Sequence, residues 1–292
     1  MNVEIKQIAK IGGGQDGAIF GDKLFRFDSR GRCSVYDLAG LDFSGDEVRE
    51  LLAEASFSLD KSDVIAPHSN SVAFGCEYYD EGDEDPLLYT NIYNNYKNCE
   101  DELAGVCCVY RILRDGESYR STLVQLIEIG FTDERGLWRS TGDVADNRPF
   151  GNFVIDRESG KYYAFVMRDG DDVTSYLTFD LPRLSEGVPD EKYGVPRVVL
   201  SKENVLAHFD APYHNFIQGA TAVADRVYSV EGFHEGIHPA LRVIDVKEGR
   251  ELLYFDLFDA GYIYEAELIE FYRGHCIYGD HKGNLFLLRL SE

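Results

Sequence analysis

Short runs of alternating apolar and polar residues, separated by turns rich in Gly, Asp and Asn, follow one another along nearly the whole chain. A period of two places apolar side chains on one face of an extended strand, so the pattern predicts a chain built almost entirely of β-strands. One segment differs. "SGDEVRELLAEA" (residues 44–55) has Ser44 in a capping position and Glu47 three residues later, which predicts one short helix beside a loop.

A compound pattern recurs along the chain: a polar or glycine-containing cluster, an apolar strand, a turn and a second strand. The five corners formed in this way begin at Gly14, His68, Phe150, Ile217 and Tyr264. Each of the first four units offers two further strands, which in the third unit are "SYLTFDL" (175–181) and "RVVLSKENVLAHF" (197–209). The fifth unit offers only one further strand, "NLFLLRL" (284–290), and an unused strand, "VEIKQIAKI" (3–11), precedes the first corner.

This arithmetic predicts an all-β fold, a five-bladed β-propeller in which residues 1–292 form a single domain. Residues 3–11 would complete the C-terminal blade beside "NLFLLRL" and close the ring. A β-sandwich pair would also contain many short strands, and so would a six-bladed ring. Three strands at one end of the chain and one spare strand at the other favour the closed ring of five.

The first strand of each blade lines the central channel of a propeller, so polar residues at the corners should converge although they lie far apart in sequence. Those residues are Gln15, Asp16, His68, Asn70, Arg148, Asn152, His214, Asn215, Gln218, Thr221, Glu265 and Glu267. They could bond backbone groups that curving strands leave unpaired, or hold water in the channel. They could also form a concave site for a small polar ligand, bound by Gln15, His68, Asn70, Asn152, His214, Asn215 and Gln218.

Three of the corner residues are acidic and are the predicted catalytic groups if the site is enzymatic. Glu265 and Glu267 are two residues apart in one strand and would face the same side, and Asp16 would join them near the axis. Carboxylates held together raise the pKa of at least one of them, as a general acid requires. The same oxygens suit a hard divalent cation in the axial channel, such as Ca²⁺. No other cofactor and no histidine-based metal site is expected.

Composition excludes several classes of partner. The 52 acidic and 29 basic residues give a net charge of −23, which argues against binding to nucleic acid or to an anionic membrane surface. No signal-peptide pattern and no apolar run long enough to cross a bilayer occurs. The six cysteines lack CxxC spacing and are expected to be free thiols that act as small hydrophobes, which fits a cytoplasmic location.

Two corners also carry a family resemblance. "NFIQGATAVADRVYSV" resembles the repeated motif of plant-type glutaminyl cyclases, which are five-bladed propellers, through Phe216, Gln218 and Gly219. "YIYEAELIEFYRGHCIYG" is similar to the Glu form of that motif through Glu265, with Ala266 in place of Gly. The resemblance implies a propeller fold and makes Glu265 the first residue to test as a proton-transfer group.

The chain more broadly resembles bacterial β-propeller proteins, many of them uncharacterised. It is also similar to five-bladed glycosidases, in which carboxylates from separate blades surround the axis, and Asp16 lies where such an Asp would be found. Two functions therefore stay open. One is a propeller whose polar axial pocket binds a small polar ligand or ion. The other is a pocket enzyme, a cyclase, glycoside hydrolase or lyase, that uses axial carboxylates as acid and base, with His68 or His214 assisting.

Overall fold

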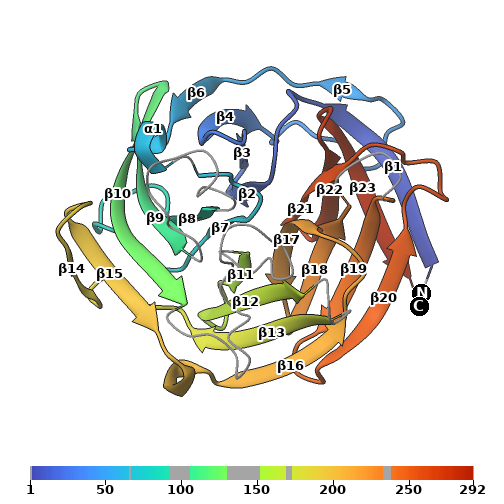
Figure 1. Cartoon of the computed structure of the whole chain (residues 1–292). Coiled ribbons are helices and arrows are strands. Elements are labelled where there is room, and N and C mark those ends of the chain that lie inside the picture. The colour runs from blue at the N-terminus through green and yellow to red at the C-terminus, as the bar shows by residue number, and fades with distance from the viewer. Residues whose placement is uncertain are drawn as a thin grey trace.

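The computed structural model describes residues 2–65, 67–92, 106–129, 152–168, 173–232 and 238–291. Five β-sheets surround a central axis, as Figure 1 shows, and each sheet forms one blade of a propeller. The predicted all-β, five-bladed fold is therefore confirmed. No helix among the described residues is long and apolar enough to cross a membrane.

The blades follow one another around the ring in chain order, each with its first strand innermost. Blade one contains β2 (Gly17–Phe20), β3 (Lys23–Phe27), β4 (Arg32–Asp37) and β6 (Ala55–Ser58). Blade two contains β7 (Val72–Phe74), β8 (Leu88–Ile92), β9 (Val106–Asp115) and β10 (Ser118–Ile129), extended by β15 (Val195–Leu200) and β14 (Val188–Asp190). Blade three contains β11 (Phe153–Asp156), β12 (Lys161–Arg168), β13 (Val173–Asp180) and β16 (Ala207–Pro212).

The last two blades show the same order of strands. Blade four contains β17 (Ile217–Val223), β18 (Arg226–Glu231), β19 (Ala240–Asp245) and β20 (Arg250–Asp256). Blade five contains β21 (Ala266–Tyr272), β22 (His275–Asp280), β23 (Asn284–Ser291) and β1 (Asn2–Lys10), with the short β5 (Arg49–Glu50) at its outer edge.

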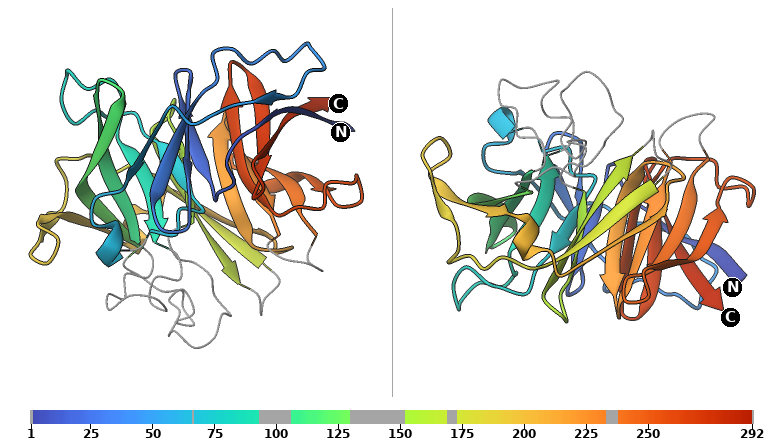
Figure 2. Two further views of the ribbon diagram at one scale, coloured as in Figure 1. Left: turned by 90° about the horizontal axis from the view of Figure 1, so that it is seen from above. Right: turned by 60° about the horizontal axis from the view of Figure 1, so that its bottom comes forward.

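The N-terminal strand closes the ring as predicted. β1 runs antiparallel to β23, with Ile5 opposite Leu288 and a bulge between Gln7 and Ala9. Ile8 and Ala9 are buried and pack in one cluster with Leu285 of β23. The two termini consequently lie side by side at blade five (Figure 2).

The helix predicted for residues 44–55 is wrong. The Ser44 hydroxyl and backbone N–H both donate to the Asp42 carboxylate, so Ser44 belongs to a turn, and Arg49–Glu50 pairs in parallel with β1. Phe43 and Leu51 pack against the core between blades five and one. Burial of these side chains and pairing with β1 therefore override a weak local helix signal. The short helix α1 lies instead at Ser62–Ile65.

The strand predicted over residues 197–209 is divided between two blades. Its first part, β15, pairs in parallel with β10 of blade two, where Leu126 lies opposite Arg197, and its Val198 and Leu200 join the core between blades two and three. Only β16 completes blade three, by pairing with β13.

Apolar cores fill the spaces between neighbouring blades. In the core between blades one and two, the Phe25 ring meets the Phe74 ring edge-on at 5.1 Å. Cys107 and Cys108 point into different cores, as expected for neighbours in a strand. All cysteines of the described residues are free, and of these only Cys76 is exposed.

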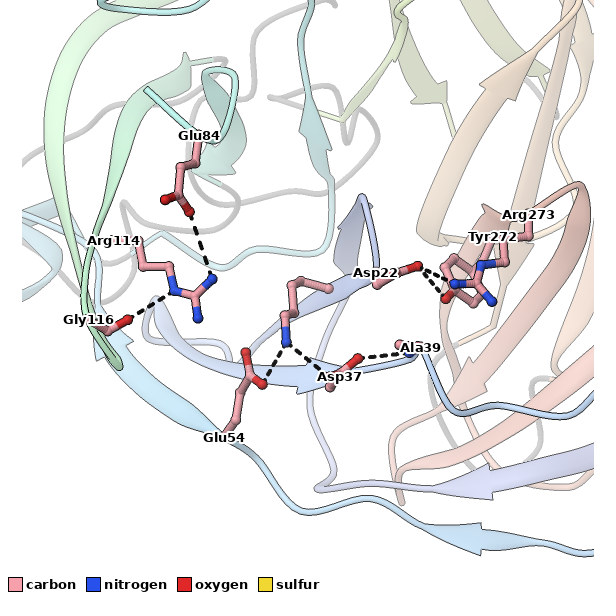
Figure 3. A network of polar contacts seen from close by, with 10 residues as sticks. Asp22, Asp37, Ala39, Glu54, Glu84, Arg114, Gly116, Tyr272 and Arg273 are labelled. Carbon is pink, nitrogen blue, oxygen red and sulfur yellow. Dashed lines mark hydrogen bonds and ion pairs between the residues drawn. The ribbon is translucent and has the colours of Figure 1, made fainter. Parts of the chain in front are cut away.

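Polar contacts join the blades outside these cores. At the seam between blades five and one, the Asp22 carboxylate accepts hydrogen bonds from the Tyr272 hydroxyl at 2.7 Å and from the Arg273 guanidinium at 2.8 Å (Figure 3).

Candidate functional site

One backbone hydrogen bond repeats at every corner and defines equivalent positions in the five blades. The carbonyl at the corner accepts a hydrogen bond from an N–H near the end of the second strand. The five residues that supply this carbonyl are Asp16, Ser71, Asn152, Phe216 and Glu265. The corners predicted from sequence therefore occupy matching places around the axis.

Blades four and five carry a further feature, a β-bulge at the start of the innermost strand. The register shifts between Ile217 and Gly219 in β17 and between Ala266 and Leu268 in β21, so Gln218 and Glu267 are the extra residues. A bulge re-aims the side chain of its extra residue. The structural equivalent of Gln218 is therefore Glu267, although the sequence motif matched it to Glu265.

The innermost strands of three blades meet closely at these bulges. A Cβ atom on Gly219 would lie 2.5 Å from the Glu267 carbonyl oxygen and 3.0 Å from Asp16 Oδ1. Only glycine fits in so small a space. Asp16 from blade one, Gly219 from blade four and Glu267 from blade five therefore converge on the axis.

Several predicted site residues join neighbouring blades by hydrogen bonds. Gln15 Nε2 donates to Glu267 Oε1 at 2.9 Å, linking blades one and five. Gln218 Nε2 donates to Glu265 Oε1 at 2.7 Å, linking blades four and five. Asp16 Oδ2 accepts from the Val72 N–H at 2.9 Å, linking blades one and two. These contacts hold the ring together at its corner end.

A cluster of asparagines links blades two and three. Asn91 of β8 is fully buried, and its Nδ2 donates to Asn70 Oδ1 and, at 3.0 Å, to Asn152 Oδ1. Asn152 Nδ2 is buried and has no hydrogen-bond partner among the described residues. Asn91 was not predicted because it lies on a second strand, although an amide inside the apolar run "LLYTNIY" is a usable signal.

Asp16 and Glu267 are buried carboxyl groups that keep unused oxygens. Asp16 Oδ1 and Glu267 Oε2 find no hydrogen-bond partner within the described parts of the chain. Burial raises the pKa of both groups well above the ordinary value, and the charge of Glu265 raises the pKa of Glu267 further. The predicted rise in carboxyl pKa is present, but burial contributes more to it than repulsion between like charges does.

Arg26 of β3 lies among these carboxyl groups and was missed by sequence reasoning. It is buried, its Nη2 donates to the carbonyl oxygens of Gly14 and Asp280, and its charge lowers the pKa of both Asp16 and Glu267. A cation inside the apolar run "KLFRF" is the signal that could have identified it.

The other residues predicted at the corners are His68, His214, Asn215 and Arg148. His68 is partly buried, which lowers its pKa. His214 Nε2 lies 3.1 Å from Glu251 Oε2 and its ring packs on Tyr254, while Asn215 Oδ1 accepts the N–H of Phe216. Arg148 lies outside the described residues.

A cavity of about 500 Å³ lies on the axis toward the other ends of the innermost strands. All five blades contribute to its wall, through Ile19, Phe74, Ile155, Thr221 and Phe271 among others. Of the predicted corner residues, Thr221 lines it.

Glu270 is the acidic group of β21 that lines this cavity. Its carboxylate accepts hydrogen bonds from the Thr221 hydroxyl and, at 2.9 Å, from the Phe271 N–H. Burial raises its pKa to about 7, against an ordinary value of 4.5. The charge of Glu270 also raises the pKa of Asp16. The carboxyl group on the cavity wall and the buried carboxyl groups at the corners therefore interact electrostatically.

Arg157 supplies a positive charge at the exposed edge of the cavity. Its Nε donates to the Gly75 carbonyl at 3.1 Å, and its guanidinium lies over the Phe20 ring at 4.9 Å. The lining also includes Asp156, whose carboxylate is bonded within its own turn, and the exposed Glu158. The lining is therefore net acidic.

One group with the composition of a metal site lies away from the axis. Within the described residues, His238, Asp256 and Asp259 each place a ligand atom within 4.8 Å of the others. His238 Nδ1 already pairs with Asp256 Oδ2 at 2.7 Å, and His238 and Asp259 are exposed. This group was not predicted, because its members converge only after folding.

No family model matches the chain, and no curated protein matches it. Among solved structures, the PQQ-bound aldose sugar dehydrogenase of Streptomyces coelicolor matches with a TM-score of 0.50 and 11% identity, over 99% of this chain and 98% of that one. An oxidoreductase (glucose dehydrogenase) of Thermus thermophilus matches with a TM-score of 0.47 and 10% identity, over 99% and 100% of the two chains. At such identities the similarity shows the fold alone. The chain is a five-bladed β-propeller, similar in fold to the Streptomyces enzyme.

Proposed function

We propose that this propeller binds a small polar molecule, neutral or positively charged, in its axial cavity. The observation that carries the proposal is the position of Glu270, a largely desolvated carboxyl group on the wall of a cavity to which all five blades contribute. Concave sites with a few convergent polar groups are where proteins commonly bind small ligands.

The hydrogen-bonding groups of the cavity define what the ligand must offer. Glu270 changes between donor and acceptor near its pKa of about 7, and Thr221 holds it in place. Apolar residues, among them Ile19, Phe74 and Ile155, also belong to the lining. A ligand with a hydroxyl or amino group on a compact carbon skeleton satisfies both requirements.

Charge disfavours anions. Glu270, Asp156 and Glu158 outnumber Arg157 on the lining, and the chain as a whole carries a net charge of −23. PQQ, which the Streptomyces dehydrogenase binds, is a tricarboxylate and does not fit this set of groups.

Acid–base catalysis is the second candidate function, and the pKa of Glu270 favours it. A general acid or base works best when its pKa is close to the operating pH. Asp16 and Glu267 also have raised pKa values and could exchange protons with Glu270. Glu265 would take part from its position at the corner of blade five. Because the Arg26 guanidinium already lies among these carboxyl groups, they are better suited to hold protons than a divalent cation. A cyclase-like or glycosidase-like activity would use these carboxyls.

A thermal-shift and NMR screen tests the binding function. The panel contains neutral sugars, amino alcohols, amino acids, dicarboxylates, PQQ and divalent ions. We expect neutral or amine-bearing compounds to bind, and Glu270→Gln to weaken their Kd at least about tenfold, because it removes a hydrogen bond to a charged group. Glu248→Gln, an exposed control, should leave Kd unchanged.

Two results would contradict the binding proposal: preferential binding of dicarboxylates or PQQ, or equal affinities in Glu270→Gln and the unmodified chain. Turnover of a hit that is lost in Glu270→Gln, or in Asp16→Asn with Kd unchanged, would establish the second candidate. Absence of turnover for every bound compound would count against it.

A further inference from the structure

The axial cavity carries a positively charged side chain, Arg157, whose position is fixed by three blades. Arg157 follows β11 of blade three and reaches toward the two preceding blades. Its Nε donates to the Gly75 carbonyl of blade two at 3.1 Å, and its guanidinium carbon lies 4.9 Å from the centre of the Phe20 ring of blade one. The side chain is exposed and lines the cavity, so this cation is held at the cavity edge.

The Arg157 guanidinium keeps donors for a ligand. Within the described part of the chain it forms no ion pair and no hydrogen bond beyond the one from Nε, so Nη1 and Nη2 keep their N–H groups. The neighbouring Asp156 carboxylate accepts hydrogen bonds from Glu158 and Ser159 instead. The two terminal nitrogens of a guanidinium can donate parallel hydrogen bonds to the two oxygens of a carboxylate.

Glu270 lines the same cavity from blade five and carries the opposite charge when ionised. Burial raises the pKa of Glu270, and the charge of Arg157 lowers it, so the two groups interact electrostatically. Among the described residues, Arg157 and Glu270 form no direct ion pair. An acid and a base that share one cavity without neutralising each other by contact are both available to a ligand.

The rest of the lining suits an apolar substituent. Ile19, Ala73, Phe74, Val154 and Ile155 all line the cavity. Its volume of about 500 Å³ lies within the range of small-molecule sites in proteins. A matching ligand therefore combines a cationic group, an anionic group and an apolar part.

We propose that the ligand of the axial cavity is a zwitterionic amino acid with an apolar side chain, an inference that rests on the binding function proposed above. Its ammonium group donates to the Glu270 carboxylate, and its carboxylate accepts paired hydrogen bonds from Arg157. Its side chain contacts the apolar part of the lining. Such a ligand has no net charge, so the acidic lining that disfavours anions does not exclude it.

Calorimetric titration with three compounds of one carbon skeleton tests the inference. Leucine has both charged groups, leucinol lacks the carboxylate, and 4-methylpentanoate lacks the amine. The titration is made at about pH 8.5, where Glu270 is ionised because its pKa is about 7, and where the amines of leucine and leucinol remain largely protonated. We expect leucine to bind at least about tenfold more tightly than either of the other compounds.

Variants assign the two charged groups. Arg157→Gln should weaken leucine binding at least about tenfold without weakening leucinol binding, because leucinol has no carboxylate for Arg157. Arg157→Lys keeps the charge and should retain part of the leucine affinity. Glu270→Gln should weaken the binding of both amines, and the exposed control Arg250→Gln should affect neither. Comparable melting temperatures confirm that the variants are folded.

Three results would overturn the inference: absence of leucine binding, leucine affinity no greater than that of leucinol, and an Arg157→Gln variant that weakens both amines equally or neither. Leucinol binding that depends on Glu270 would in each case leave the proposed binding function standing. A Glu270→Gln variant that weakens neither amine would contradict the binding function as well.

Discussion

Deletion of residues 1–10 is expected to lower the free energy of unfolding by about 5 kcal/mol or more, a loss comparable to the whole stability of many domains. The deletion removes the buried Ile8 and Ala9 and uncovers Leu285 and Leu287 on β23. It also leaves the backbone of β23 unpaired along the edge where β1 now lies. An open edge of this kind favours aggregation.

Urea denaturation followed by circular dichroism measures this effect. The truncated chain should show a broad transition or aggregate, and an added peptide of residues 1–11 should restore a cooperative transition. Lys10→Ala, an exposed change within β1, serves as the control and should unfold as the unmodified chain does. A truncated chain with unchanged stability would mean that β1 does not close the ring.

Replacement of Arg242 with alanine is expected to lower the free energy of unfolding by about 3–5 kcal/mol, because it leaves the buried Glu231 without its charged partner. The side chains of Arg242 and Glu231 are fully buried, with Nη1 of Arg242 3.3 Å from Glu231 Oε1. Arg242 Nε also donates to Glu251 at 2.9 Å, and its Nη2 donates to the Pro212 carbonyl.

The cost should depend on pH in a defined direction. The pKa of Glu231 is raised to about 7 by burial even with Arg242 present, and removal of Arg242 raises it further. A raised native-state pKa stabilises the protein at low pH, and this contribution disappears as pH rises through that pKa. Arg242→Ala should therefore destabilise more at pH 8 than at pH 5.

Denaturation of the variant at both pH values tests this prediction. The double variant Arg242→Met, Glu231→Gln should recover much of the loss, because no buried charge remains. Arg250→Ala, an exposed control in the same blade, should cost less than about 0.5 kcal/mol. An equal loss of unfolding free energy at pH 5 and pH 8 would show that Glu231 is not the buried acid left without a partner.

The fold was predictable because a propeller reveals its closure in the strand count. Three strands after Tyr264 and one before Gly14 made a complete blade, and β1 pairs with β23 as that count required. Residues 44–55 and β15 were misassigned because their partners, β1 and β10, lie far away in sequence. Non-local pairing of this kind leaves no local signal.

The corner residues were predictable from polar clusters that precede apolar strands, but the direction of side chains in β21 was not. Strict alternation would place Glu265 and Glu270 on opposite faces of the strand. The bulge at Glu267 breaks the alternation, so that Ala266 and Ile269 share one core and Leu268 faces another. Glu270 therefore lines the axial cavity, whereas the sequence pattern predicted only Glu265 and Glu267 as axial acids of this strand.

Five innermost strands surround one axial cavity, and the half-buried Glu270 on its wall has a raised pKa. Titration of the Glu270 carboxyl carbon by ¹³C NMR, assigned with Glu270→Gln, tests this claim most directly. The structure predicts a midpoint near the pKa of about 7. A midpoint near the ordinary value of 4.5 would show a hydrated carboxylate and contradict the account.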